Sequence, residues 1–314
     1  MKKKGNTIIL VSFSILVIAL GLFEIFFWFG TSSNDLDDAK DKFITVQNND
    51  IYYTVKGNGP PVLLIHSGSW SGVEYDGIIE QLKSNYTVYA VDMPGFGRSD
   101  KPQTSYTVSY LTEQMSGFID KFPEKEFHLV GASVGGSIAL QLAANHPKQI
   151  KTLTLIDPFG FGDDINQTAV LAQLPILSEL VLFPNRFTFN YILNHGLLSN
   201  KALDDDYRDK LFTTTKVPKA QRAKLSLLRS TITGRGVHKD VRTAVDEAAK
   251  KVKQPVLLIW GEHDTYAPFE QSEAALKIIS KSQLKSLPKA GHFAHMEAPQ
   301  QVAKYINSFL KNKK

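Results

Sequence analysis

Short apolar runs alternate with stretches of helical character from Phe43 to the end of the chain, and this alternation restricts the fold more than any other feature. The runs are rich in Val, Ile and Leu, which is typical of strands buried on both faces of a mostly parallel sheet. Helices between them would cover both faces, so the sequence predicts a doubly wound α/β domain over residues 43–314. The predicted strands are 62–65, 87–91, 127–130, 151–156, 256–260 and 283–287, and the predicted helices are 71–83, 109–121, 134–145, 269–280 and 299 to the C-terminus.

Two features modify this regular pattern. Residues 43–47 and 51–55 flank an Asn-Asn-Asp turn signal and predict an antiparallel hairpin at the start of the domain. About a hundred residues separate the strands at 151–156 and 256–260. This interval is rich in helix-forming residues and is interrupted by prolines, which predicts an inserted helical cap at about residues 160–245. We expect its strongly apolar part, 171–183, either to pack the cap against the core or to form an apolar ceiling over a binding site.

The first thirty residues have a different character. Three lysines at positions 2–4 precede a nearly uninterrupted apolar run over residues 7–29. At about 1.5 Å per residue, a helix of this length reaches roughly 35 Å, enough to cross a bilayer. The run ends in Phe-Phe-Trp-Phe, which is typical of an interfacial aromatic belt. We therefore predict a membrane anchor at residues 1–30 and a linker at 31–42. A weak small-residue match at 30–32 leaves open that the segment is a cleaved signal.

The flanking charges predict the orientation of this span. Lysines precede it, whereas Asp35, Asp37 and Asp38 follow it. Positive charge is retained on the cytoplasmic side, so we expect a single-pass protein of the cell membrane whose domain at residues 43–314 is extracytoplasmic.

The composition excludes several classes of function. The chain has no cysteine, which excludes disulfides, a cysteine nucleophile and thiolate metal sites. Its net charge is +5, and the basic residues are scattered rather than arranged in a stripe, so we expect no nucleic-acid partner.

The strongest chemical motif is Gly-Ala-Ser-Val-Gly at residues 131–135, between a predicted strand and a predicted helix. This is the G-x-S-x-G nucleophile elbow, in which small residues allow a tight turn that exposes the serine hydroxyl. The surrounding residues match neither the dinucleotide fingerprint nor the phosphate loop. We predict that Ser133 is a nucleophile.

A serine nucleophile needs a base and an orienting carboxylate, and both follow downstream. Asp264 comes just after the strand at 256–260, and His292 lies in a loop after the last predicted strand. The order Ser133, Asp264, His292 is that of the hydrolases with this architecture. Asp157, at the end of the strand before the cap, is an alternative acid. His295 could pair with His292 on a metal, but a third ligand is lacking and we expect a packing role, with no metal.

Together, the motifs at 66–68, 92–99, 131–135, 261–264 and 291–297 resemble those of the α/β-hydrolase superfamily, in particular its lidded serine esterase-like branch. The resemblance covers residue 43 to about residue 310. It implies that Ser133 attacks the substrate, His292 transfers the proton and Asp264 fixes the histidine tautomer. It also implies an oxyanion hole from the backbone N–H groups of Val134 and Gly68. The family usually has His-Gly before the second donor, whereas this chain has Ser67 in the glycine position.

The sequence therefore predicts a serine hydrolase that cleaves a carboxylic ester or similar acyl bond through an acyl-enzyme. Trp70 and Phe159 are candidate pocket residues, the expected substrate is a small, apolar, ester-like molecule, and no cofactor is needed. Carbon–carbon bond hydrolases and perhydrolases share the triad and remain alternatives. A hydrolase-fold sensor that acts through a protein partner is a third alternative, and such a partner is unknown.

Overall fold

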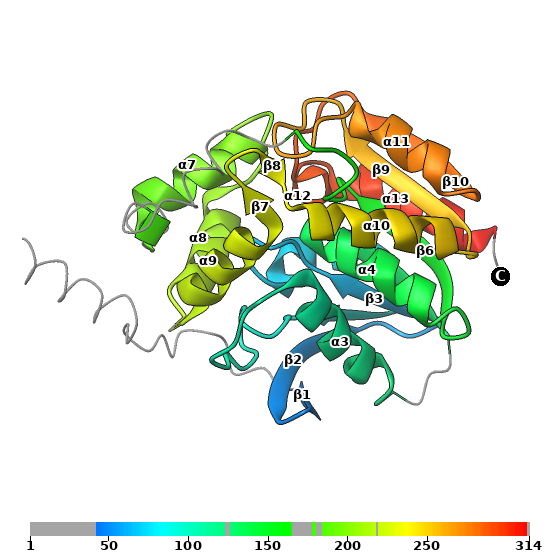
Figure 1. Ribbon diagram of the computed structural model, residues 1–314, viewed down its shortest axis with the longest axis horizontal. Coiled ribbons are helices and arrows are strands. Elements are labelled where there is room, and N and C mark those ends of the chain that lie inside the picture. The colour runs from blue at the N-terminus through cyan, green and yellow to red at the C-terminus, as the bar shows by residue number, and fades with distance from the viewer. Residues whose placement is uncertain (1–41, 123–125, 165–177, 180–183, 218, 313–314) are drawn as a thin grey trace, which may run out of the picture.

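The computed structural model describes residues 42–122, 126–164, 178–179, 184–217 and 219–312 (Figure 1). The predicted membrane anchor and all of the predicted linker except Lys42 lie outside these residues, and the membrane span stays a prediction. Most of the apolar stretch at 171–183 also lies outside them. Within the described ranges, no helix combines the length and apolarity that crossing a membrane requires.

An eight-stranded, mostly parallel sheet forms the centre of the molecule, as the strand pattern predicts. The strand order is β1-β2-β4-β3-β5-β6-β9-β10, and only β2 pairs with its neighbours in antiparallel fashion. The central strands are buried along almost their whole length, which explains their continuous Val, Ile and Leu content. The bounds are β1 Lys42–Val46, β2 Asn49–Lys56, β3 Pro61–Ile65, β4 Thr87–Val91, β5 Phe127–Ala132, β6 Ile150–Ile156, β9 Val256–Gly261 and β10 Ser282–Leu287.

The predicted hairpin is present as β1 and β2, with a shorter turn than the sequence signal suggested. Gln47 and Asn48 connect the strands with φ values of 47° and 68°. Two successive residues in this left-handed region match the right-handed twist of a hairpin, and Asn accepts that conformation readily. Asn49 and Asp50 are therefore already part of β2.

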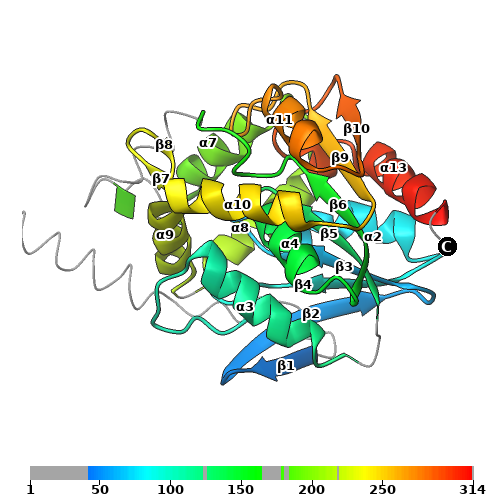
Figure 2. The same cartoon turned by 45° about the vertical axis from the view of Figure 1, so that its right-hand side comes forward.

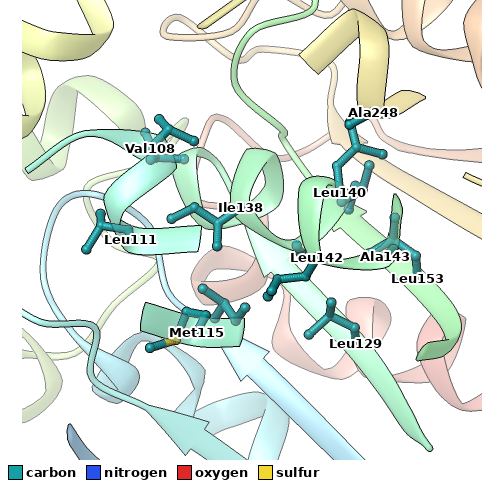
Figure 3. Packing of buried hydrophobic residues seen from close by; sticks show 14 of the residues in the cluster. Val108, Leu111, Met115, Leu129, Ile138, Leu140, Leu142, Ala143, Leu153 and Ala248 are labelled. Carbon is teal, nitrogen blue, oxygen red and sulfur yellow. The ribbon is translucent and has the colours of Figure 1, made fainter. Parts of the chain in front are cut away.

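Helices cover both faces of the sheet. On one face, α4 (Val134–Asn145) packs between α3 (Val108–Ile119) and α10 (Lys239–Lys251), as Figure 2 shows. Side chains from α3 and α4 interdigitate with those of β5 and β6 in this core (Figure 3). Helix α11 (Gln271–Ile278) joins the same face, whereas α2 (Asp76–Leu82), α12 (Ala294–Glu297) and α13 (Pro299–Lys311) cover the other.

The described part of the interval between β6 and β9 contains the helical cap that the prolines and composition predicted. It contains α7 (Arg186–Gly196), α8 (Asp205–Thr215), α9 (Ala220–Thr231) and the short antiparallel pair β7 (Ile232–Thr233) and β8 (Gly236–Val237). These elements gather at one side of the molecule in Figure 1. The predicted cap boundary near residue 245 falls inside α10, which packs on α4 and belongs to the layer covering the sheet.

Candidate active site

Ser133 lies in the tight turn between β5 and α4. Its backbone has φ 51° and ψ −122°, a conformation that a non-glycine residue adopts only under constraint. A Cβ atom on Gly131 would lie 2.3 Å from the carbonyl oxygen of Gly135, and one on Gly135 would lie 2.2 Å from that of His66. The glycines therefore allow the close backbone approach that holds Ser133 above the end of the strand.

The three predicted triad residues lie together. His292 Nε2 is 2.9 Å from Ser133 Oγ, and His292 Nδ1 is 2.7 Å from Asp264 Oδ2. All three side chains are buried, with residue exposures of 5–8%. These distances allow His292 to accept the serine proton at Nε2 while it donates its Nδ1 proton to the carboxylate.

The loop after β9 orients Asp264. Its second oxygen, Oδ1, accepts hydrogen bonds of 2.8 Å from the backbone N–H groups of both Tyr266 and Ala267. The ring of Tyr266 packs beside that of His292, with centroids 5.1 Å apart. Tyr266 was not among the predicted site residues, because nothing in the motif distinguishes it from a core aromatic.

Asp157, the alternative acid, has other partners in the structure. Its Oδ1 accepts a hydrogen bond from Gly261 N at 2.8 Å, and its Oδ2 accepts one from Ala294 N at 3.3 Å. Burial, followed by the nearby charge of Asp264, raises the pKa of Asp157 well above its usual range. The carboxyl group thus ties the ends of two neighbouring elements together, whereas His292 Nδ1 faces Asp264.

The two predicted oxyanion donors are close to each other. Val134 N–H belongs to the first turn of α4, where amides have no acceptor inside the helix. A Cβ atom on Gly68 would lie 3.5 Å from the Val134 side chain. The amides of Ser67, Ser69 and Trp70 donate to side-chain acceptors. Among residues 67–70, which we call the oxyanion loop, Gly68 N–H is the amide outside that network.

A buried carboxylate explains why serine occupies the usual glycine position at residue 67. Glu74, with no exposed surface, accepts hydrogen bonds from Ser67 N at 3.0 Å and from Ser67 Oγ at 2.6 Å. It also accepts one from Trp70 N at 3.2 Å and contacts His295 Nε2 at 3.2 Å. Burial alone would raise the pKa of Glu74, but His295 and His66 lower it below its usual value. Sequence reasoning missed Glu74, which belongs to none of the motifs.

We expect Glu74→Gln to destabilise the protein and to slow turnover. An amide nitrogen cannot accept a hydrogen bond, so one of the buried donors of the oxyanion loop would lose its acceptor. Leaving such a group unpaired costs about 1–3 kcal/mol, which urea unfolding at pH 7 would measure. Glu80→Gln on the exposed surface of α2 is the matched control and should change stability little. Equal urea midpoints for both variants would contradict the proposed role of Glu74.

His295 lies under the oxyanion loop, beside Glu74. Its ring contacts Glu74 and packs against Tyr75 with centroids 5.1 Å apart. Across the described residues, no group of three or more His, Asp or Glu side chains is arranged to hold a metal ion.

A small cavity, partly open to solvent, lies between the cap and the oxyanion loop. Trp70 and the cap residues Phe189, Ile192 and Lys224 contribute to its walls. The Trp70 ring also contacts that of Phe293, the neighbour of His292, at 4.9 Å between centroids. Phe159 packs against the main core instead and is not among the described lining residues. Its pocket role stays a prediction.

The C-terminal end of the cap helix α7 is hydrogen-bonded to the loop that carries His292, which we call the histidine loop. His292 N donates to the carbonyl oxygen of Gly196 at 2.7 Å. Glu297 bridges the same two segments, because its Oε1 accepts from Gly291 N at 2.7 Å and its Oε2 from Leu198 N at 2.8 Å. A Cβ atom on Gly291 would lie 2.3 Å from the Gly196 carbonyl oxygen, so this junction is closely packed.

Comparisons with known proteins agree with this architecture. A family model described as alpha/beta hydrolase fold matches residues 60–299. An uncharacterized protein of Mycobacterium tuberculosis is 28% identical over 277 residues, which cover 86% of this chain and 80% of the relative. A monoacylglycerol lipase of Xenopus laevis is 26% identical over 324 residues, which cover 95% and 89% of the two chains.

Solved structures share the fold at lower sequence identity. The crystal structure of a membrane phospholipase A, described as a bacterial virulence factor, superposes with a TM-score of 0.75. It is 23% identical, and the alignment covers 100% of this chain and 99% of that one.

Proposed function

Because the chain belongs to the α/β-hydrolase family, we propose that it is a serine hydrolase that cleaves a carboxylic ester or a similar acyl bond through an acyl-enzyme. The observation that carries this proposal is the continuous hydrogen-bonded arrangement from Ser133 Oγ through the His292 imidazole to the Asp264 carboxylate. Names of relatives such as monoacylglycerol lipase support a hydrolase as well.

In the proposed acylation step, Ser133 Oγ attacks the substrate carbonyl carbon while His292 Nε2 removes the hydroxyl proton. Asp264 holds the Nδ1 proton and stabilises the imidazolium that forms. The Gly68 and Val134 amides stabilise the negative charge that develops on the carbonyl oxygen. His292 then gives its proton to the departing alcohol, and the bond between the carbonyl carbon and the alcohol oxygen breaks.

In the proposed deacylation step, a water molecule replaces the alcohol. His292 Nε2 takes a proton from this water, and the resulting hydroxide attacks the acyl carbon. The tetrahedral intermediate collapses, the bond to Ser133 Oγ breaks, and the serine recovers a proton from His292. The products are a carboxylic acid and the regenerated enzyme.

For the substrate, we propose an ester with one apolar chain. Trp70, Phe189 and Ile192 form an apolar part of the cavity wall, as expected for a site that binds such a chain. The similarity to a monoacylglycerol lipase supports a single-chain acyl ester in particular.

Turnover of p-nitrophenyl esters of increasing chain length tests this proposal. We expect many turnovers per protein molecule, complete loss of activity after one equivalent of fluorophosphonate, and a preference for medium over very short chains. A single burst of nitrophenol with a stable adduct would instead favour a hydrolase-fold sensor. An absence of any ester cleavage would contradict the proposal.

We also propose that the N-terminal apolar run anchors the protein in the cell membrane with its catalytic domain outside the cytoplasm. Support comes from the length of the run and from the lysines that precede it. We expect the full chain made in cells to remain in the membrane pellet after alkaline carbonate extraction. Protease added to spheroplasts should digest the catalytic domain. A shortened chain in the medium would show a cleaved signal instead, and protection from protease would show the reverse orientation.

A further inference from the structure

The cavity beside Trp70 contains a charged group that the proposed mechanism does not use. Lys224, on α9, is the one ionisable side chain among the described residues that line this cavity. The remaining walls are aromatic, aliphatic or neutral polar. Within the described part of the chain, no carboxylate forms an ion pair with Lys224, unlike Lys210, which pairs with Asp76, and Arg229, which pairs with Glu179.

Gln221 provides a second polar group in the same cavity. It precedes Lys224 by three residues on α9, so the two side chains lie on neighbouring turns of one helix face. Its Nε2 donates to the carbonyl oxygen of Thr215 at 2.9 Å, which fixes the amide. Gln221 is only 6% exposed, and its buried Oε1 has no hydrogen-bond partner among the described residues. This buried acceptor is open to a donor from a bound ligand or a water molecule.

The same helix leads from these polar groups to the oxyanion loop. Leu227 follows Lys224 by three residues, and a Cβ atom on Gly68 would lie 3.1 Å from its Cδ2. One helical turn, about 5 Å, therefore separates Lys224 from the side chain that packs on the oxyanion loop. Trp70 continues this wall towards Phe293 and the triad. A substrate arm that passes Trp70 would enter the cavity that Lys224 lines.

We propose that Lys224 and Gln221 form a subsite for an anionic group, a carboxylate or a phosphate, on the arm of the ester that lies away from the scissile bond. The Lys224 ammonium would donate charge-assisted hydrogen bonds to the anion, and Gln221 Oε1 would accept one from a neighbouring hydroxyl. This inference deepens the proposed function and rests on it. It predicts that the preferred substrate is a charged amphiphile rather than a fully neutral ester.

The protonation of Lys224 makes this subsite sensitive to pH. Burial lowers the pKa of Lys224 to about 8, and the charge of Glu74, below the oxyanion loop, opposes the decrease. The ammonium is therefore mostly present at pH 7 and mostly lost at pH 9. Preference for an anionic substrate should fall as the pH rises through 8.

Two matched pairs of esters test the proposal and distinguish the two anions. Mono-p-nitrophenyl adipate and its methyl ester differ by one carboxylate on the acyl arm. Decanoylglycerol phosphate and decanoylglycerol differ by one phosphate on the alcohol arm, and this phosphate keeps its charge above pH 7.5, since its second pKa is about 6. The measured quantity is the ratio of kcat/KM for the charged ester to that for the neutral one. A general loss of activity cancels in this ratio, as does the pH dependence of the triad.

Lys224→Met is expected to lower this ratio about tenfold or more for at least one pair, since a charge-assisted hydrogen bond contributes about that much. The pair that responds identifies the anion. Lys216→Met, which removes an exposed cap lysine, is the control for general loss of positive charge and should change the ratio about twofold at most. Lys224→Arg, whose charge persists above pH 12, should retain the preference at pH 9, where the unmodified protein loses it.

The subsite would be overturned if Lys224→Met and the unmodified protein gave equal ratios of kcat/KM for both pairs of esters. In that case, Ser133-dependent cleavage of the neutral esters would still leave the proposed function intact. If no ester were cleaved, the proposed function would fail, and binding would test the subsite separately. In a Ser133→Ala background, Lys224→Met should then weaken binding of the charged esters about tenfold by calorimetry. Unchanged affinity would overturn the subsite independently of catalysis.

Discussion

Replacement of Ser133 by alanine is expected to abolish covalent labelling by a fluorophosphonate and to reduce ester turnover by roughly 10³-fold or more. The hydroxyl oxygen lies 2.9 Å from His292 Nε2 and is the atom that would carry the acyl group. Without it, His292 and the oxyanion amides can only assist direct attack by water. Gel-based labelling and steady-state kinetics on one ester would measure both effects.

Ser137→Ala is the matched control for this experiment. Ser137 is also buried in α4, one turn further along the helix, and donates a hydrogen bond to the carbonyl oxygen of Phe159 at 2.5 Å. Its replacement should affect stability but leave fluorophosphonate labelling in place. Labelling that persists in Ser133→Ala, or that disappears in Ser137→Ala alone, would contradict the assignment of the nucleophile.

Asp264→Asn should reduce kcat by about 10⁴-fold while preserving the fold. The carboxylate Oδ2 accepts the Nδ1 proton of His292 at 2.7 Å, whereas an amide at this position can present an N–H and favour the wrong tautomer. His292 Nε2 would then carry the proton and could no longer accept one from Ser133. Pre-steady-state measurement of acylation would locate the defect in proton removal.

Asp157→Asn separates this role from that of the neighbouring carboxyl group. The raised pKa of Asp157 favours its uncharged form. Its two oxygens accept from backbone amides, and an asparagine side chain would leave one of these amides without an acceptor. We expect a change in kcat of about tenfold or less, because the contact between Asp264 and His292 is retained. A greater loss of kcat in Asp157→Asn than in Asp264→Asn would assign the acid to the end of β6.

The sequence was most informative where chemistry and backbone geometry depend on the same few residues. The elbow around Ser133 needs small residues at fixed spacing, so both the turn and the position of the candidate nucleophile could be predicted from five residues. Asp264 and His292 could be placed because each follows a recognisable strand. Glu74 and Lys224 could not be predicted in this way. Their importance depends on which loop or cavity they face, and this is decided by packing between segments far apart in the chain.

The fold shows the same division. The strand bounds of β4 and the helix bounds of α4 agree with the predicted ranges, because these segments are buried and strongly patterned. In the predicted helix at 71–83, the structure has a 3-10 turn, Gly72–Tyr75, followed by α2. Glu74 in this turn binds the oxyanion loop, so a tertiary contact accompanies a local departure from regular helix geometry. The end of the cap could not be predicted from the sequence for the same reason. Helix α10 differs from the cap helices only in what it packs against.

The junction between the cap and the histidine loop has a consequence for engineering this enzyme. Replacing the cap with that of another hydrolase is an obvious route to new specificity. In this protein, however, the Gly196 carbonyl oxygen at one end of a cap helix accepts a hydrogen bond from the backbone N–H of His292. A chimera would have to keep residues 196–198 and Glu297 as native sequence and place both splice points outside them. Variation in the remainder of the cap would then reshape the cavity without shifting His292.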